Sequence, residues 1–130
     1  MSNVTDVPPR EISRYMNELV NFINNRGYGK LGLVEQAACV HYRFSQIQPC
    51  PNSGVTARLL MNFVLIRSRY PLTVVRWNDR REYFDSLDKR DSIYVLQFVT
   101  KCVMFTLNAY LIRTRECLMP IGYDINRPET

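Results

Sequence analysis

The residues of this 130-residue chain that are best suited to chemistry lie where a polar loop meets a predicted helix. The helix is expected to begin near Val55 and carries Arg58 in its first turn. Free backbone N–H groups at a helix N-terminus favour anions, and an arginine beside them adds a charge-assisted donor. Arg58 is therefore a candidate phosphate contact, with a purely structural ion pair as the alternative, and the neighbouring candidates are Asn52, Ser53, Gly54 and Thr56.

A single histidine, His41, limits the acid–base chemistry that the chain can perform. It excludes every site that needs two or more histidines, including His-rich zinc centres. His41 lies within an apolar helical pattern, which favours a role in packing over a role as a catalytic base. Cys50 is a second candidate nucleophile, but only His41 could serve as its base. The cysteines form no C-x-x-C pair, and we predict no metal site.

The composition indicates one folded domain with a modest basic excess. Hydrophobic residues make up 46% of the chain and charged residues 22%, and the formal net charge is +5. That charge allows phosphate-bearing partners such as nucleic acid. A basic nucleic-acid-binding helical module is therefore one alternative, although we consider nucleic acid an improbable partner because the basic residues form no run. It would require five arginines on one face, Arg67, Arg69, Arg76, Arg80 and Arg81.

The cysteines and the apolar segments predict the cellular compartment of the protein. We expect Cys39, Cys50, Cys102 and Cys117 to be mostly buried free thiols, which favours a reducing compartment. The N-terminus has no apolar segment of a signal peptide, and the longest apolar stretch, residues 59–66, is too short to cross a bilayer. The expectation is a soluble cytoplasmic protein that does not bind membranes.

The hydrophobic periodicity predicts an all-α bundle of about five helices. The helices are expected at residues 10–25, 33–47, 55–70, 78–87 and 92–115, with an extended segment at 72–75. Glycines at positions 27 and 29 are expected to end the first helix with a left-handed cap, and the sole tryptophan, Trp77, to pack over a turn. The predicted domain spans 10–118, between a disordered leader at 1–9 and a flexible tail at 119–130.

The second helix and the loop after it resemble the Fic (Fido) domain family. The family pattern is His-Tyr-x-Phe-x-x-Ile at a helix end, then His-Pro-Phe-x-(Asp/Glu)-Gly-Asn-(Gly/Lys)-Arg, then x-x-Arg. The chain has the helix end as His41-Tyr42-Arg43-Phe44-Ser45-Gln46-Ile47 and continues Gln48-Pro49-Cys50-Pro51-Asn52-Ser53-Gly54-Val55-Thr56-Ala57-Arg58. The segments Arg81-Glu82-Tyr83-Phe84-Asp85-Ser86-Leu87 and Phe98-Val99-Thr100-Lys101-Cys102 are also similar. The resemblance implies a Fic-like fold and a relation to enzymes that transfer AMP from ATP to protein hydroxyls.

The chain departs from the family pattern at the positions that carry the chemistry. The base position is Gln48, the aromatic after Pro49 is Cys50, and the acidic Mg²⁺ ligand is missing, with only Asn52 nearby. The first motif arginine falls at Val55, and the loop is one residue shorter than the pattern. Four motif positions survive, Pro49, Gly54, Thr56 and Arg58. The upstream hairpin flap that aligns the target in the family is also expected to be missing.

These departures predict an inactive member of the family that acts, if at all, by binding a protein. An amide such as that of Gln48 takes up no proton at neutral pH, so we assign no catalytic residue. The alternative is a weakly active nucleotidyltransferase that uses ATP and Mg²⁺ as cofactors through Arg58. The sequence predicts neither the target protein nor the oligomeric state.

Overall fold

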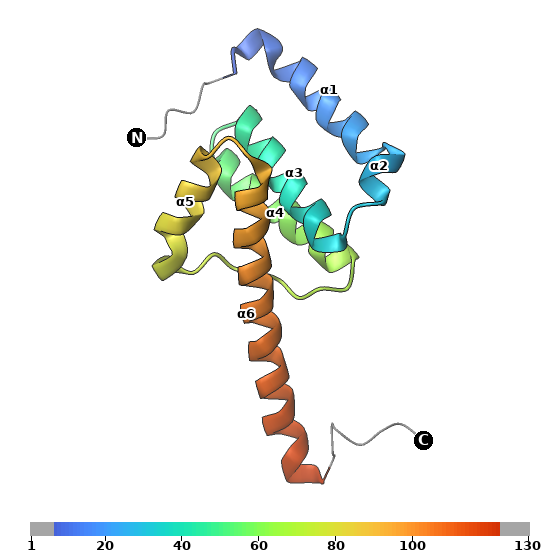
Figure 1. Ribbon diagram of the computed structural model, residues 1–130, viewed down its shortest axis with the longest axis vertical. Coiled ribbons are helices and arrows are strands. Elements are labelled where there is room, and N and C mark those ends of the chain that lie inside the picture. The colour runs from blue at the N-terminus through green and yellow to red at the C-terminus, as the bar shows by residue number, and fades with distance from the viewer. Residues whose placement is uncertain (1–6, 123–130) are drawn as a thin grey trace.

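The computed structural model describes residues 7–122, and this part of the chain consists of helices and connections without a strand (Figure 1). It contains six α-helices: α1 (Ile12–Ile23), α2 (Arg26–Gly29), α3 (Leu33–Ile47), α4 (Ser53–Arg67), α5 (Arg80–Asp88) and α6 (Ser92–Leu118). Three short 3-10 helices accompany them: η1 (Pro9–Glu11), η2 (Trp77–Asp79) and η3 (Met119–Ile121). The predicted all-α class is confirmed, and the additional helix is the single turn α2.

The centre of the fold is the contact between α3, α4 and the first half of α6. Buried residues recur at four-residue steps on α4 and α6, which places them on one face of each helix. The shared apolar cluster comprises Ala37, Ala38, Met61, Leu65, Val95, Val99 and Val103. The alanines of α3 leave room for the larger side chains of its neighbours, so this cluster fixes the position of α4 relative to α3.

Helix α1 covers the other side of α3 (Figure 1). It contributes Leu19 to a second buried cluster, which also contains Phe44, Ile47 and Ala57. Because Ile47 ends α3 and Ala57 lies in α4, this cluster holds the two ends of the loop that carries the candidate site.

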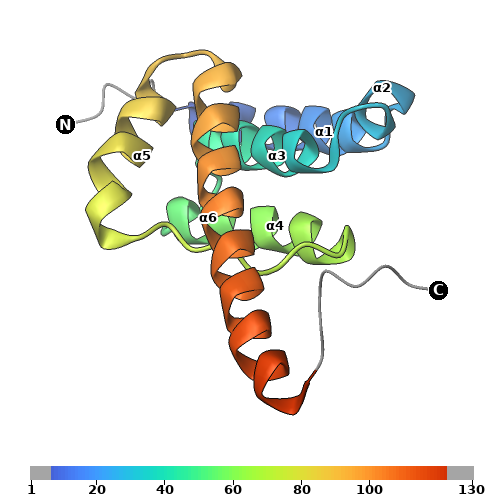
Figure 2. The same cartoon turned by 60° about the horizontal axis from the view of Figure 1, so that its bottom comes forward.

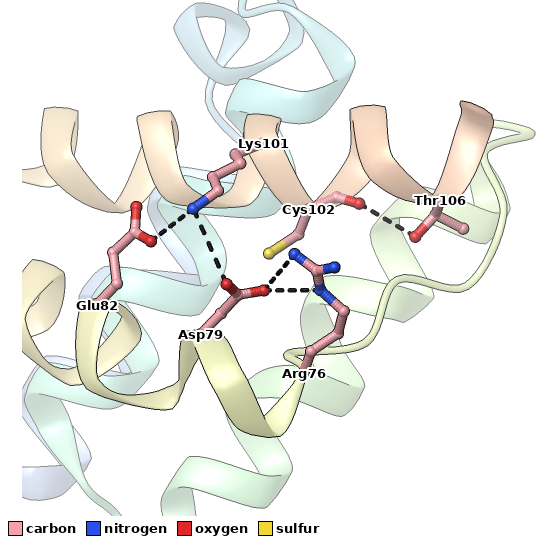
Figure 3. Close-up of polar contacts among 6 residues, drawn as sticks. All are labelled: Arg76, Asp79, Glu82, Lys101, Cys102 and Thr106. Carbon is pink, nitrogen blue, oxygen red and sulfur yellow. Dashed lines mark hydrogen bonds and ion pairs between the residues drawn. The ribbon is translucent and has the colours of Figure 1, made fainter. Parts of the chain in front are cut away.

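A group of charged side chains on η2, α5 and α6 lies beside the contact between α5 and α6 (Figure 3). Lys101 Nζ lies 2.6 Å from Glu82 Oε2 and 3.9 Å from Asp79 Oδ1. Asp79 also pairs with Arg76 at 2.7 Å. Cys102 lies beside this group, and burial, reinforced by the Asp79 charge, raises the pKa of its thiol to about 11. Exposed ion pairs of this kind add little stability, so the position of α5 depends mainly on the buried cluster of Tyr83, Phe98 and Cys102 that joins it to α6.

The prediction for residues 24–29 is wrong. Helix α1 ends at Ile23, and Asn25 then caps α2, because its side-chain oxygen accepts a hydrogen bond from the Gly27 N–H at 2.8 Å. Gly27 and Gly29 lie inside α2 without a positive φ. An asparagine N-cap, and not a left-handed glycine, therefore separates the two helices.

Four other helix boundaries differ from the prediction. Helix α4 begins at Ser53, because Asn52 has a left-handed conformation (φ 60°), and it ends before Arg69, which is also left-handed (φ 65°). Residue 78 lies in η2 and not in α5, and α6 continues to residue 118. The predicted extended segment lies in the connection 70–76, which Asn62 of α4 holds through hydrogen bonds to the Thr73 N–H and C=O at 2.8 and 3.0 Å.

The predicted leader and tail fall partly on residues 1–6 and 123–130, which lie outside the described residues. Within the described part, Pro9 already begins η1, and residues 119–121 form η3.

Two predictions about side-chain burial are wrong. Cys50 and Cys117 are exposed and Cys39 is partly buried, so Cys102 alone among the four thiols is buried. Trp77 lies on η2 at the surface and is 78% exposed.

Helix α6 is more apolar over its whole length than the prediction from uninterrupted apolar stretches indicated. Together with η3 it forms a segment, Ser92–Ile121, that is long and apolar enough by composition to cross a membrane. Only 28% of its most apolar window is buried. The first half of α6 supplies Val95, Val99 and Val103 to the core, whereas the second half extends beyond the rest of the fold (Figure 1).

Candidate functional site

The loop between α3 and α4 is bounded by two residues in left-handed conformations. Gln48 (φ 48°) ends α3, and its N–H donates to the Phe44 C=O at 3.1 Å. Asn52 (φ 60°) begins α4, and its C=O accepts from the N–H groups of Val55 and Thr56. Non-glycine residues adopt this conformation at some energetic cost, so the surrounding packing must hold the loop in place.

The Ser53 hydroxyl holds the loop together and does not face a ligand. It accepts a hydrogen bond from the Cys50 N–H at 3.2 Å and donates one to the Cys50 C=O. Ser53 is only 6% exposed, whereas Cys50 is exposed. The Ser53 hydroxyl, one of the predicted phosphate-binding groups, is therefore already used in hydrogen bonds to the Cys50 backbone.

Asn52 and Thr56 also serve the helix terminus. The Asn52 side chain makes no capping hydrogen bond, and the Thr56 hydroxyl donates to the Asn52 C=O at 3.5 Å. Gly54 is exposed and helical, and a Cβ placed on it would lie 3.5 Å from Arg58 Nη1. The Arg58 guanidinium thus folds back over the first turn of α4, beside the N-terminal N–H groups.

Gln48 and Gly54 line a small cavity of about 200 Å³. Its other lining residues are Ser45, Gln46, Tyr83, Phe84, Leu87 and Asp88. Ligand sites usually enclose about 300–1,000 Å³. The cavity beside the loop is therefore smaller than a typical small-molecule site, and Asp88 gives it a negative charge.

Arg58 lies on the other side of Tyr83, in a cavity of about 390 Å³. Its Nη1 donates to the Tyr83 hydroxyl at 3.4 Å, and its guanidinium carbon lies 5.7 Å from the Tyr83 ring centroid. The remaining lining residues are Val75, Arg76, Trp77, Arg80 and Phe84. Arg80 lies over the rings of Trp77 and Phe84, at 5.1 and 5.5 Å. This cavity is basic and aromatic.

His41 is buried and lines neither cavity, but it contacts Tyr83, which lines both. Its Nε2 lies 2.8 Å from the Tyr83 hydroxyl, and the two rings meet edge to face. Burial, with the Arg58 charge as a second cause, lowers the pKa of His41 to about 4. At neutral pH the imidazole is therefore uncharged and enclosed, as expected for a packing histidine.

The three side chains form one ordered chain of hydrogen bonds. An arginine only donates, so the Tyr83 oxygen accepts from Arg58. Either the Tyr83 hydroxyl or a protonated Nε2 of His41 is the donor between these two residues, and His41 Nδ1 has no hydrogen-bond partner among the described residues. Burial raises the pKa of Tyr83, and its contacts with Arg58 partly offset this rise. Tyr83 thus links the Arg58 guanidinium to the buried His41.

The structure separates residues that the sequence analysis placed in one site. It brings Gln48 and Gly54 to one cavity and Arg58 to the other, with Tyr83 between them. Sequence reasoning from spacing missed Tyr83, Trp77 and Arg80; the one signal for Tyr83 was its place in a family-like segment. Among the described residues, no three His, Cys, Asp or Glu side chains lie close enough together to hold a metal ion.

Comparison with known sequences finds similarity to one family. The model of the Fic/DOC family matches residues 4–65. The Nematostella vectensis protein named protein adenylyltransferase Fic is 32% identical over 126 residues, covering 94% of this chain and 29% of that protein. The Aedes aegypti protein of the same name is 32% identical over 117 residues, covering 87% of this chain and 23% of that protein. The chain therefore spans less than a third of the length of these relatives.

Comparison with solved structures also finds proteins with Fic domains. A Fic-domain-containing signaling protein from Bacteroides thetaiotaomicron superposes with a TM-score of 0.72 at 29% identity, covering 79% of this chain and 46% of that one. Fic-1 from C. elegans superposes with a TM-score of 0.81 at 24% identity, covering 88% of this chain and 36% of that one. At that identity, the likeness to Fic-1 supports the fold alone.

Proposed function

Because the chain belongs to the Fic/DOC family, we propose that it is a member that has lost AMP transfer and acts by binding a protein. The observation that carries this proposal is Gln48, which occupies the position of the family's catalytic base. A base must take a proton from the attacking hydroxyl, and an amide does not do so at neutral pH. His41 is no substitute, because it is buried and bonded to Tyr83.

The residues of the loop between α3 and α4 do not fit the Mg²⁺ ion that the family resemblance implies. Mg²⁺ is usually held through one or two carboxylates together with substrate phosphates. No Asp or Glu occurs between Glu35 and Asp79, so neither the loop nor α4 contains a carboxylate. Asp88 lines the Gln48 cavity but belongs to α5. We therefore derive no step through a metal ion.

The missing base and the shortened loop together predict a large reduction in the rate of AMP transfer. Removing a general base costs on the order of 10²–10⁴ in rate. A misplacement of about 1 Å, which a one-residue shortening of the loop causes, costs about 10²-fold more. The combined loss is roughly 10⁴–10⁶, equivalent to about 5.5–8 kcal/mol of activation free energy. The small size of the cavity beside Gln48 points in the same direction.

We expect no transfer of labelled AMP when the protein is incubated with labelled ATP, Mg²⁺ or Mn²⁺, and a cell lysate. The reason is the combined absence of the base and of the acidic metal ligand. The measurement is label on protein bands, with Arg58→Ala as the matched control because it removes the surviving phosphate contact. Label that the wild-type protein transfers and that Arg58→Ala abolishes would contradict the proposal.

A second candidate function, weak binding of ATP with residual activity, is favoured by one observation. Arg58 has no acidic partner among the described residues and shares a cavity of ligand-binding size with Arg76 and Arg80. The nucleic-acid alternative has less support, because Arg81 lies in a different cavity, together with Glu82 and Asp85.

For this second candidate, ATP at about 1 mM should raise the thermal midpoint of the wild-type protein and not that of Arg58→Ala. A ligand that binds only the folded state stabilises it by mass action, so a dissociation constant near 10 µM gives a gain of about 2.7 kcal/mol at that concentration. The measurement is a thermal melt with and without ATP. The same shift in Arg58→Ala, or no shift in the wild-type protein, would exclude Arg58 as a nucleotide contact.

A further inference from the structure

The cavity that contains Arg58 is built by three segments of the chain, and we call it the basic cavity. Helix α4 contributes Arg58, the end of the connection after α4 contributes Arg76, and η2 with the start of α5 contributes Arg80 and the aromatic wall. The connection passes α6 on its way to α5, which brings η2 and α5 beside α4 (Figure 2). With a volume of about 390 Å³, the basic cavity is within the size range of ligand sites.

Two of the three arginines in the basic cavity carry a charge that no acidic side chain neutralises. Arg76 is the exception, because its Nε and Nη2 each lie 2.7 Å from Asp79 Oδ2 (Figure 3). Arg58 and Arg80 take part in none of the ion pairs among the described residues. No Asp or Glu of residues 7–122 lines the cavity. Two uncompensated guanidinium groups in one cavity favour an anionic ligand.

The available donors fit a phosphate group. A guanidinium has five N–H donors, and Arg58 donates to the Tyr83 hydroxyl from Nη1 only. The other donors of a guanidinium form a planar fork that matches the oxygens of a phosphate. Arg80 lies in the first turn of α5, where the helix dipole also favours an anion. A phosphomonoester carries a charge of about −1.5 to −2 at pH 7, so it neutralises both free guanidinium groups, whereas a carboxylate neutralises one.

The wall of the basic cavity is aromatic and open to solvent. Trp77 is 78% exposed and Phe84 is 45% exposed, although large aromatic side chains bury most of their surface in a typical fold. The Arg80 guanidinium carbon lies 5.1 Å from the Trp77 ring and 5.5 Å from the Phe84 ring. Aromatic residues and arginine are the residues most enriched at the centres of protein interfaces. A ligand with both a ring and a phosphate would contact both kinds of group.

We propose that the basic cavity binds a phosphotyrosyl side chain of a partner protein. Arg58 and Arg80 hold the phosphate, and Trp77 packs against the ring. The inference rests on the proposed protein-binding function and specifies the chemistry of the partner. ATP also has a ring and phosphates, but its triphosphate carries more charge than two guanidinium groups neutralise. No carboxylate lines the cavity to hold the Mg²⁺ that compensates such a charge.

The test uses the fluorescence of Trp77, which is the sole tryptophan of the chain and lines the basic cavity. N-acetyl-phosphotyrosine amide is titrated into the whole chain and compared with the corresponding amides of phosphoserine and tyrosine. We expect saturation with a dissociation constant of about 1 mM or below, and about tenfold weaker binding of the phosphoserine amide. The tyrosine amide should not bind measurably. Because the phosphate contacts are ionic, affinity for the phosphotyrosine amide should fall as salt increases.

The matched variants are Arg80→Gln and Arg81→Gln, which make the same change at neighbouring exposed positions of α5. Arg81 lines a different cavity, together with Glu82 and Asp85. Arg80→Gln should weaken binding at least about tenfold, because it removes hydrogen bonds to a charged group. Arg81→Gln should bind like the wild-type protein, and both variants should keep the helical circular dichroism. Affinity is taken from the midpoint of each titration, since Arg80 lies over the Trp77 ring and its replacement changes the starting intensity.

Four results would overturn the proposal. They are no fluorescence change up to about 10 mM phosphotyrosine amide, equal binding by the two variants, equal affinity for the phosphoserine amide, and tighter binding of ATP than of the phosphotyrosine amide. The titration involves no AMP transfer, so its failure would leave the proposed loss of activity standing. Conversely, AMP transfer from labelled ATP would contradict that loss without changing a measured affinity for the phosphotyrosine amide.

Discussion

Restoring the family's histidine with Gln48→His should leave AMP transfer at least about 10²-fold below that of a fully repaired loop. The substitution tests whether the base alone is missing. Gln48 is exposed and its backbone N–H is bonded within α3, so a new side chain there should not disturb the fold. Histidine also tolerates the left-handed conformation better than most residues do. The shortened loop and the missing acidic residue remain, and each of them limits the rate.

The comparison protein replaces residues 48–55 with the complete family pattern, His-Pro-Phe-x-Asp-Gly-Asn-Gly-Arg, and so adds the missing residue. Label transfer from ATP is measured for this graft, for Gln48→His and for Gln48→Ala under the same conditions. We expect Gln48→His to match Gln48→Ala. Transfer by Gln48→His at the rate of the graft would show that the loop geometry is intact and that only the base was lost.

The sequence predicts the central helices because their apolar patterns are long and clearly bounded. Helix α3 was predicted at 33–47 and lies at Leu33–Ile47, between Gly32 and a loop with two prolines. The start of α6 was also correct, because Asp91 caps it by accepting a hydrogen bond from the Ile93 N–H. Where residue types and periodicity agree, the local sequence determines the element.

The turns at the ends of the helices could not be predicted from residue types and periodicity. Within residues 7–122, four non-glycine residues have positive φ values, Gln48, Asn52, Arg69 and Arg90, and they lie at helix ends or in connections. Glutamine and arginine have no preference for that conformation, so tertiary packing imposes it. The one reversal predicted from glycine, at residues 27–29, is absent for a different, local reason: the Asn25 side chain caps α2 instead.

Sequence reasoning indicated part of the candidate site, but neither Tyr83 nor the arrangement of the residues. Spacing placed Gly54 and Arg58 on one helix turn, and they do lie together. Nothing local indicates that Tyr83, 25 residues after Arg58 and 42 after His41, bonds both of them. That contact divides the predicted site into two cavities. Since it forms only when α5 packs against α3 and α4, sequence periodicity contains no information about it.

The buried His41 should make the protein lose stability in mild acid. Its pKa is about 4 in the folded chain, below its ordinary value of 6.5, mainly because of burial. Between these two values the unfolded chain binds a proton on His41 and the folded chain does not, so lowering the pH favours unfolding. The stabilisation is complete above about pH 6.5 and lost below about pH 4. At about 1.4 kcal/mol per pH unit, the full change in the free energy of unfolding is about 3 kcal/mol.

The measurement is chemical denaturation of the wild-type protein, His41→Gln and Tyr83→Phe between pH 4 and 7. Glutamine keeps an acceptor for the Tyr83 hydroxyl but does not titrate, so His41→Gln should lose about 3 kcal/mol less than the wild-type protein across this range. Tyr83→Phe removes the hydrogen bond but leaves the imidazole buried, so it should retain the pH dependence of the wild-type protein. Because carboxylates titrate in all three proteins, the difference between variants isolates the histidine. Parallel pH profiles for the wild-type protein and His41→Gln would show that His41 protonates freely in the folded state, which would reopen the possibility that it acts as a base.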